Sequence, residues 1–184
     1  MHYDAIVVGG GLAGAALAKS LSERGYRVLI LERETRFRDR VRGEGMFPWG
    51  VSAARALGIY DHLASTCGNQ TRWVRTWVGG NLFAERDLEA TAPHRVGMIN
   101  FYHPAMQEAL LQLAEKAGAE VRRGIAVEGV LPGDPLRVEF EEKGGRVSLE
   151  ARVVVGADGR NSLVRSWGGF EVRRDPDRLM IAGL

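Results

Sequence analysis

Two nearly unbroken apolar runs, residues 3–8 and 27–31, stand near the start of the chain. Runs of this kind are typical of strands that are covered on both faces of a parallel sheet. Between them, residues 15–21 have the apolar spacing of a helix with a small-residue face, and Gly25 stands where a glycine ends a helix. The pattern therefore predicts a strand–helix–strand unit that closes at Glu32.

The alternation of helix and strand patterns continues along the chain with one interruption. Pro48 and Pro104 suit the first turn of a helix, and apolar positions at helical spacing follow each of them. The interruption lies at 71–84, where an alternating strand, a Gly-Gly-Asn turn and a short return strand predict a hairpin. The other expected elements are helices over 49–57, 60–64 and 104–117, strands over 97–101, 120–122 and 153–155, a β-meander of strands near 126–131, 136–141 and 146–150, and a charged loop over 34–47.

Composition and charge exclude several classes of protein. The chain has 184 residues, 45% of them hydrophobic and 26% charged, which is ordinary for one medium-sized globular domain. The formal net charge is only +2 and the basic residues are spread along the sequence, so no nucleic-acid partner is expected. No apolar run approaches the length of a membrane span, and the N-terminus has no leader-like pattern.

Cysteine and histidine usage argues against a metal site. Cys67 is the single cysteine, so a disulfide framework and a thiolate metal site are both excluded. The four histidines show no ligand-like spacing, and no metal is expected. Together with the absence of a leader pattern, this usage predicts a cytoplasmic protein. Leu179–Leu184 forms an apolar run with no polar tail, from which we expect the front portion of a larger protein or a truncated form.

Three spaced glycines follow the first strand, and each meets a steric demand of dinucleotide binding. Gly9 lets the chain turn sharply, Gly11 lets a pyrophosphate approach the backbone, and Gly14 lets the helix lie close to the strand. The N–H groups at the start of the helix, including those of Leu12 and Ala13, then face the phosphates. Glu32 stands about 20 residues further on, where a carboxylate accepts hydrogen bonds from a ribose diol. These residues predict a dinucleotide site.

The sequence at this point resembles the FAD-dependent monooxygenases of the aromatic-hydroxylase (p-hydroxybenzoate hydroxylase-like) type. Gly9-x-Gly11-x-x-Gly14 with Glu32-Arg33 matches the FAD-type fingerprint of that family, and residues 40–44 are similar to its arginine-bearing segment under the flavin. His103 falls where the family usually has Arg or Gln at the start of a helix. Residues 156–165, with Asp158-Gly159, are similar to its Asp-Gly motif. The resemblance extends to about residue 180.

The resemblance implies a fold, a cofactor and a set of binding residues. The fold would be α/β, a Rossmann-like FAD-binding fold of the glutathione reductase and p-hydroxybenzoate hydroxylase type, with the β-meander and the start of a substrate-domain sheet. The cofactor would be FAD, with NAD(P)H as a transient co-substrate. The residues implied to bind FAD, beyond those of the glycine turn and Glu32, are Arg33, Arg42, Gly43, His103, Asp158 and Gly159. No catalytic residue can be named.

The implied reaction is hydroxylation or epoxidation of an electron-rich, aromatic small molecule with NAD(P)H and O2. A related flavin-dependent reductase or halogenase, and a non-catalytic nucleotide-binding fragment, remain as alternatives. The chain departs from the family at His103, which is equally consistent with a helix-start residue before Pro104, and in lacking the later Gly-Asp motif.

The resemblance also implies a division into domains. Residues 1–70 and 97–170 would form a discontinuous FAD-binding domain, and residues 71–96 and 171–184 would be parts of a substrate domain. Trp73, Arg75 and Trp77 would share one strand face and either line the substrate side or pack on that domain. The oligomeric state is left undetermined.

Overall fold

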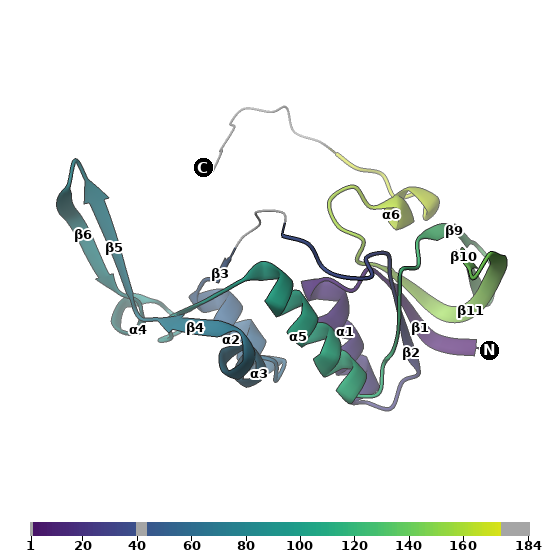
Figure 1. The fold of residues 1–184 in the computed structure, drawn as a ribbon, viewed down its shortest axis with the longest axis horizontal. Coiled ribbons are helices and arrows are strands. Elements are labelled where there is room, and N and C mark those ends of the chain that lie inside the picture. Colours follow the sequence, from purple (N-terminus) through teal and green to yellow (C-terminus); the bar gives the residue numbers. More distant parts are fainter. Residues whose placement is uncertain (1, 40–43, 174–184) are drawn as a thin grey trace.

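The computed structural model describes residues 2–39 and 44–173. Its largest sheet has six strands in the order β8-β2-β1-β11-β10-β9. Figure 1 labels β1, β2, β9, β10 and β11 of this sheet. β8, β2, β1 and β11 run parallel, whereas β9, β10 and β11 form an antiparallel meander, so the predicted strand–helix–strand unit and meander are both confirmed. The bounds are β1 (His2–Val8), β2 (Val28–Glu32), β8 (Glu120–Arg123), β9 (Val127–Leu131), β10 (Leu136–Glu142) and β11 (Gly145–Gly156).

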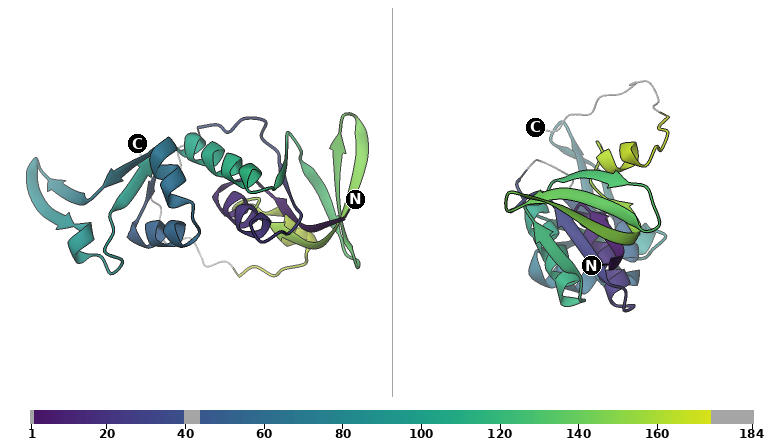
Figure 2. Two further views of the ribbon diagram at one scale, coloured as in Figure 1. Left: turned by 90° about the horizontal axis from the view of Figure 1, so that it is seen from below. Right: turned by 90° about the vertical axis from the view of Figure 1, so that its right-hand side faces the viewer.

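Two helices, α1 (Leu12–Ser22) and α5 (His103–Lys116), lie side by side on one face of this sheet (Figures 1 and 2). They form one core with side chains such as Val7 and Ile30 of the adjoining strands. On the other face, Leu29 packs with Phe140 of β10, because the meander contributes to a second core there. All five residues of β2 are consequently buried, as its unbroken apolar run predicts.

A smaller antiparallel sheet has the order β3-β7-β4. Its strands are β3 (Gly45–Met46), β4 (Gly68–Thr71) and β7 (Met98–Phe101), and the helices α2 (Pro48–Ala56) and α3 (Tyr60–Thr66) contact it. Leu63 of α3 and Ile99 of β7 are fully buried in the same core as α5. This shared core fixes the smaller sheet to the larger one.

The predicted hairpin is present, and it projects from the body of the molecule (Figures 1 and 2). It consists of β5 (Trp73–Val78) and β6 (Asn81–Asp87), followed by the short helix α4 (Leu88–Thr91). All six residues of β5 are exposed, and so are the first six of β6. The described part of the chain therefore leaves the aromatic side chains Trp73, Trp77 and Phe83 in solvent.

The structure corrects two predictions for the stretch before the Asp-Gly motif. Residues 146–150 and 153–155 do not form separate strands, because residues 145–151 of β11 pair with β10 and residues 150–156 pair with β1. The fully apolar run of residues 153–155 favours a strand that is covered on both faces, yet Val153 is 52% exposed. An apolar run indicates that a strand forms. Its burial also requires a layer that covers it, and the described residues do not supply such a layer at Val153.

Three short elements were missed in the sequence. β3 falls within the stretch predicted as a loop, β4 carries the polar sequence Gly-Asn-Gln-Thr, and α4 has only four residues. β3 and β4 exist as strands because each pairs with β7. Tertiary pairing therefore decided these two strands against weak local preference. The helix α4 is instead capped by Asp87, whose side chain accepts from the N–H groups of Glu89 and Ala90.

Candidate functional site

The glycine turn between β1 and α1 has different surroundings at each of its three glycines. Gly9 has a φ of +103°, and a Cβ there would overlap the carbonyl of Ala157. A Cβ on Gly14 would overlap the carbonyl of Gly9, so the helix can lie this close only with glycine. A Cβ on Gly11 would meet nothing nearer than Gln107 Nε2 at 3.9 Å. The first and third glycines shape the turn, and the second leaves open space beside the backbone.

Glu32, the last residue of β2, is held as an oriented acceptor beside this turn. Its side chain is buried, with 6% of the residue exposed. The backbone N–H of Gly10 donates to Oε2 at 2.7 Å, and that of Glu34 donates to Oε1 at 2.8 Å. A carboxylate oxygen accepts more than one hydrogen bond. The Glu32 carboxylate is therefore fixed by the backbone N–H groups of Gly10 and Glu34 and can still accept hydrogen bonds from the two hydroxyl groups of a ribose.

The N-terminus of α1 supplies donors to the same region. Gly11 is the N-cap residue and provides no side-chain cap. The first-turn N–H groups of Leu12, Ala13 and Gly14 have no acceptor within the helix, and the helix dipole adds partial positive charge there. This combination suits an anion such as a pyrophosphate.

These groups meet in one cleft of about 750 Å³ at the carboxyl ends of the parallel strands. Ligands of open α/β sheets bind at this edge. The cleft brings together predicted residues from three distant parts of the sequence: Gly9, Gly11, Glu32, Arg33, Asp158 and Gly159. Arg33 is largely exposed there and forms a 3.7 Å ion pair with Glu34.

Asp158 follows β11 at the far side of the cleft and caps a short helix, α6 (Leu163–Trp167). Its Oδ2 accepts from the N–H groups of Leu163 at 2.7 Å and Val164 at 3.2 Å, while the Ser162 hydroxyl accepts from the backbone N–H of Arg165 at 3.0 Å. Burial alone would raise the pKa of Asp158, but the hydrogen bonds from Ser162 and from these backbone groups outweigh it and lower that pKa. Asp158 Oδ1 is buried and has no hydrogen-bond partner among the described residues.

Several lining residues were not identified in the sequence. Gln107 faces the glycine turn from α5, and Phe37 and Ile125 line the cleft beside Glu32. The available signal for Gln107 was its position one helical turn after His103. Phe37 and Ile125 carried no signal, because a loop residue and a residue after a short strand reach the cleft only through tertiary packing.

The remaining predicted residues occupy other positions. His103 is half-buried at the first residue of α5, and the described lining of the cleft includes Gln107 rather than His103. Arg42 and Gly43 lie outside the described residues, as does the apolar run 179–184.

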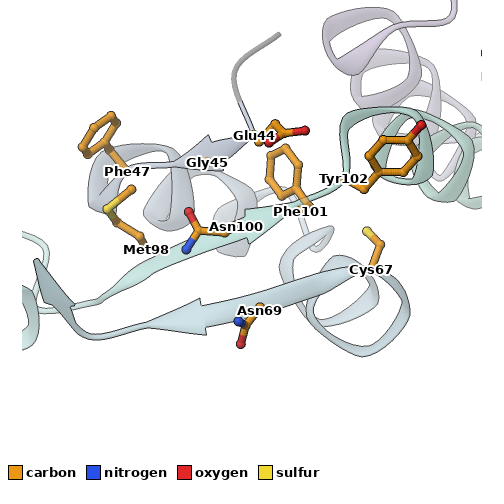
Figure 3. A pocket seen from close by; sticks show the side chains of 9 residues that line it. All are labelled: Glu44, Gly45, Phe47, Cys67, Asn69, Met98, Asn100, Phe101 and Tyr102. Carbon is orange, nitrogen blue, oxygen red and sulfur yellow. The ribbon is translucent and has the colours of Figure 1, made fainter. Parts of the chain in front are cut away.

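A second, open hollow of about 820 Å³ lies over the small sheet (Figure 3). Phe47, Met98 and Phe101 contribute apolar surface, and Asn69 and Asn100 contribute amide groups from neighbouring strands (Figure 3). Asn100 donates to Thr71 Oγ1 at 2.6 Å, so its amide is oriented. The hollow suits a largely apolar small molecule that carries polar substituents.

The described residues contain neither a membrane-spanning helix nor a candidate metal-binding cluster. Within residues 2–39 and 44–173, no helix is long and apolar enough to cross a membrane. The same ranges contain no group of three or more His, Cys, Asp or Glu side chains that could hold a metal ion.

Comparison with known proteins identifies the family. A family model described as an FAD binding domain matches residues 2–184. The chain belongs to the FAD-binding domain family. The α/β fold and FAD as the cofactor of this FAD-binding domain follow from that membership, and they confirm the resemblance found in the sequence.

Curated relatives of the FAD-binding domain include several oxidoreductases. The chain is similar to rifampicin monooxygenase of Streptomyces venezuelae, with 35% identity over 96% of this chain and 36% of the relative. It is also similar to a probable NADH-specific resorcinol 4-hydroxylase of Rhodococcus jostii, with 31% identity over 92% of this chain and 33% of the relative. A third relative, digeranylgeranylglycerophospholipid reductase 2 of Methanococcoides burtonii, has 28% identity over 95% of this chain and 42% of the relative. The chain thus spans about a third to two fifths of these relatives.

Solved structures agree with this membership. Pseudomonas aeruginosa PqsL in complex with 2-aminobenzoylacetate has a TM-score of 0.78 and 25% identity, over 96% of this chain and 48% of that one. Aklavinone-11 hydroxylase, solved as a ternary complex with FAD and aklavinone, has a TM-score of 0.76 and 26% identity, over 91% of this chain and 35% of that one.

The cleft of this FAD-binding domain fits the ADP part of the cofactor. Gly11 leaves the backbone accessible, α1 presents uncapped N–H groups, and Glu32 presents an oriented carboxylate. A carboxylate at Glu32 would repel a 2′-phosphate, so the site suits FAD rather than NADP.

Proposed function

We propose that the protein is an FAD-dependent monooxygenase that hydroxylates or epoxidises an electron-rich, aromatic small molecule with NAD(P)H and O2. The observation that carries the proposal is the single cleft that unites the open Gly11, the N-terminus of α1, Glu32 and Asp158. Support also comes from the monooxygenase and the hydroxylase that are similar over more than nine tenths of this chain.

Each residue predicted to bind FAD has a proposed part in holding it. Gly9 and Gly14 shape the turn, while Gly11, Leu12 and Ala13 receive the pyrophosphate. Glu32 accepts from the adenosine ribose, with Arg33 beside it. Asp158 and Gly159 face the pyrophosphate region from the other side, and Arg42, Gly43 and His103 contact the cofactor further along. Bound FAD supplies the redox chemistry, and the protein supplies position and exclusion of water.

We also propose the division of the chain into domains. Residues 1–70 and 97–170 form the FAD-binding domain, and residues 71–96 and 171–184 belong to a substrate domain. The projecting hairpin of β5 and β6 supports the first part of this division, because its exposed Trp73, Trp77 and Phe83 suit a surface that packs against further structure.

The hollow over the small sheet is the proposed position of the aromatic substrate. Phe101 and Met98 offer contacts to an aromatic ring, and the amides of Asn69 and Asn100 offer hydrogen bonds to hydroxyl or carbonyl substituents (Figure 3). The substrate and O2 are the proposed partners. A cytoplasmic location is part of the same proposal and is supported by the lone Cys67.

Flavin spectroscopy and oxygen consumption test this function. The purified protein is expected to carry oxidised FAD, and NAD(P)H is expected to reduce it faster when an aromatic substrate such as a phenol is present. One O2 is then consumed for each hydroxylated product, which mass spectrometry with labelled O2 detects. A protein that binds no FAD, or that shows no product oxygen derived from O2 with any substrate of a phenol panel, contradicts the proposal.

A flavin-dependent reductase is a second candidate, favoured by the similarity to the digeranylgeranylglycerophospholipid reductase over 95% of this chain. The two reactions differ in their need for O2. Turnover of an unsaturated substrate without O2, with saturation of a carbon–carbon double bond, would support the reductase. Product formation that stops when O2 is removed would support the monooxygenase.

A further inference from the structure

Arg123 lies on the strand next to Glu32, at the end of the cleft that Glu32 lines. It is the last residue of β8, and its Cα is paired in register with that of Glu32 on β2. Two residues later, the N–H of Ile125 donates to the carbonyl of Glu32 at 3.0 Å. The backbone around Arg123 is thus fixed to the strand that carries the ribose acceptor.

The guanidinium of Arg123 makes three different kinds of contact. Its Nη1 donates to both carboxylate oxygens of Glu108 on α5, at 2.9 and 3.0 Å. Its Nε donates to the carbonyl of Glu34 at 3.4 Å, and its Cζ lies 4.7 Å from the ring centroid of Phe37. Arg123 Nη2 is buried and has no partner among the described residues. An unpaired buried donor carries a free-energy cost, and the other contacts must offset it.

Two of these partners belong to the cleft itself. Glu34 and Phe37 both line it, and the N–H of Glu34 is one of the two donors that hold the Glu32 carboxylate. The segment 33–38 has no helix or strand of its own to fix its shape. Its conformation beside Glu32 therefore depends on side-chain contacts, and Arg123 joins the segment to both β8 and α5.

We propose that Arg123 is a positioning residue for the adenosine end of the cleft. It holds the segment 33–38 so that Glu34 orients the Glu32 carboxylate and Phe37 forms an apolar wall for the adenine base. This inference rests on the proposed role of the cleft in binding the ADP part of FAD. Arg123 acts through Glu34 and Phe37 and is not among the residues that line the cleft.

The geometry requires arginine rather than any cation. A lysine at this position keeps a positive charge for Glu108, but it lacks the flat face that stacks on Phe37 and the separate Nε donor for Glu34. Arg123→Lys therefore removes the positioning contacts while it retains the ion pair.

The adjacent residue offers a matched control. Arg122 lies on the same strand, and its side chain is 23% exposed against 24% for Arg123. It pairs with Glu120 and Glu142 and makes no contribution to the lining of the cleft. Arg122→Lys therefore reports the effect of weakening an equivalent ion pair away from the ligand.

The experiment measures ADP binding by calorimetry and unfolding by thermal denaturation for the purified protein and its variants. Arg123→Lys is expected to raise the Kd for ADP by about five- to tenfold, the effect of losing coupled contacts. Arg122→Lys is expected to leave this Kd within about twofold. Phe37→Leu is expected to raise the Kd for ADP as well. The double variant Phe37→Leu/Arg123→Lys is expected to have a Kd no higher than that of the single variant with the higher Kd, because Arg123 acts on ADP through Phe37.

The outcomes separate a positioning role for Arg123 from a purely structural one. An ADP affinity that is unchanged in Arg123→Lys, or that falls equally in Arg122→Lys, overturns the inference. A loss of thermal stability in Arg123→Lys without a change in ADP affinity assigns Arg123 a structural role and also overturns it. Glu32→Ala separates a failure of the proposed function from a failure of the inference about Arg123. Normal ADP binding by Glu32→Ala would mean that the cleft is not the nucleotide site.

Discussion

The strands β2 and β5 have similar apolar character but opposite surroundings. β2 reads Val-Leu-Ile-Leu-Glu and has all five residues buried, whereas β5 reads Trp-Val-Arg-Thr-Trp-Val and has all six residues exposed. β2 has a strand on each side, helices over one face and the meander beside the other. β5 has only β6 as its partner among the described strands. Burial therefore reflects the layers that surround a strand rather than its apolar sequence alone.

The buried region can hold a ligand rigidly, and the exposed hairpin offers a surface. Glu32 at the end of β2 is buried, and the backbone N–H groups of Gly10 and Glu34 donate to its carboxylate. On the hairpin, Arg75 pairs with the cross-strand Glu85, and both side chains are exposed to solvent. Exposed pairs of this kind contribute little to stability. The difference suits the proposed division between a preformed cofactor site and a surface for a substrate domain.

The same substitution in the two regions gives the largest expected contrast. Leu29→Ala in β2 opens a cavity in a fully buried position and should lower the free energy of unfolding by about 2–5 kcal/mol. Leu82→Ala in β6, where the leucine is 48% exposed, should change it by less than about 0.5 kcal/mol. Urea denaturation of both variants measures this. Equal losses would show that the hairpin is packed in solution.

The glycines of the turn separate folding from binding. Gly14→Ala places a Cβ against the carbonyl of Gly9 and should cost about 1–3 kcal/mol of stability, as overpacking does. Gly11→Ala meets no such atom and should fold nearly normally, but its methyl group occupies the space proposed for the pyrophosphate. Thermal denaturation and ADP titration together check this pair. Normal ADP affinity in Gly11→Ala would count against the phosphate assignment.

Glu32 and Glu85 test whether the buried carboxylate acts on the ligand. Glu32→Ala removes the ribose acceptor and should cost about 1–3 kcal/mol of nucleotide binding, the range for a lost buried hydrogen-bond partner. Glu85→Ala removes the exposed partner of Arg75 on the hairpin and should leave nucleotide binding unchanged. Calorimetric titration with ADP or FAD measures both. Unchanged affinity in Glu32→Ala would defeat the ribose assignment.

Two capping aspartates give the smallest expected contrast. Hydrogen bonding to Arg72 lowers the pKa of Asp87, and burial, which would raise the pKa of Asp158, is outweighed there by its hydrogen bonds. A carboxyl whose folded pKa lies below the ordinary 3.8 stabilises the protein above that value, and this contribution is lost as the pH falls through the folded pKa.

Asp158→Asn should therefore remove part of the acid sensitivity of unfolding below pH 3.8. Asp87→Asn should remove less, because the main partner of Asp87 is the half-exposed Arg72, whose charge solvent screens. Urea midpoints measured from about pH 6 down to pH 3 test this order. A larger effect in Asp87→Asn would reverse the comparison.

The amino-acid sequence by itself determined the strand–helix–strand unit, the glycine turn, Glu32, the Asp158-Gly159 turn and the family. These features depend on local demands, such as a left-handed φ at Gly9, that few residues satisfy. The tertiary structure decided the rest. Pairing with β7 made strands of β3 and β4, and packing brought Gln107, Phe37 and Ile125 to the cleft. Packing also placed the Arg123 guanidinium over the ring of Phe37. The sequence does not predict this contact, because residues far apart in the chain leave no periodic signal when they meet.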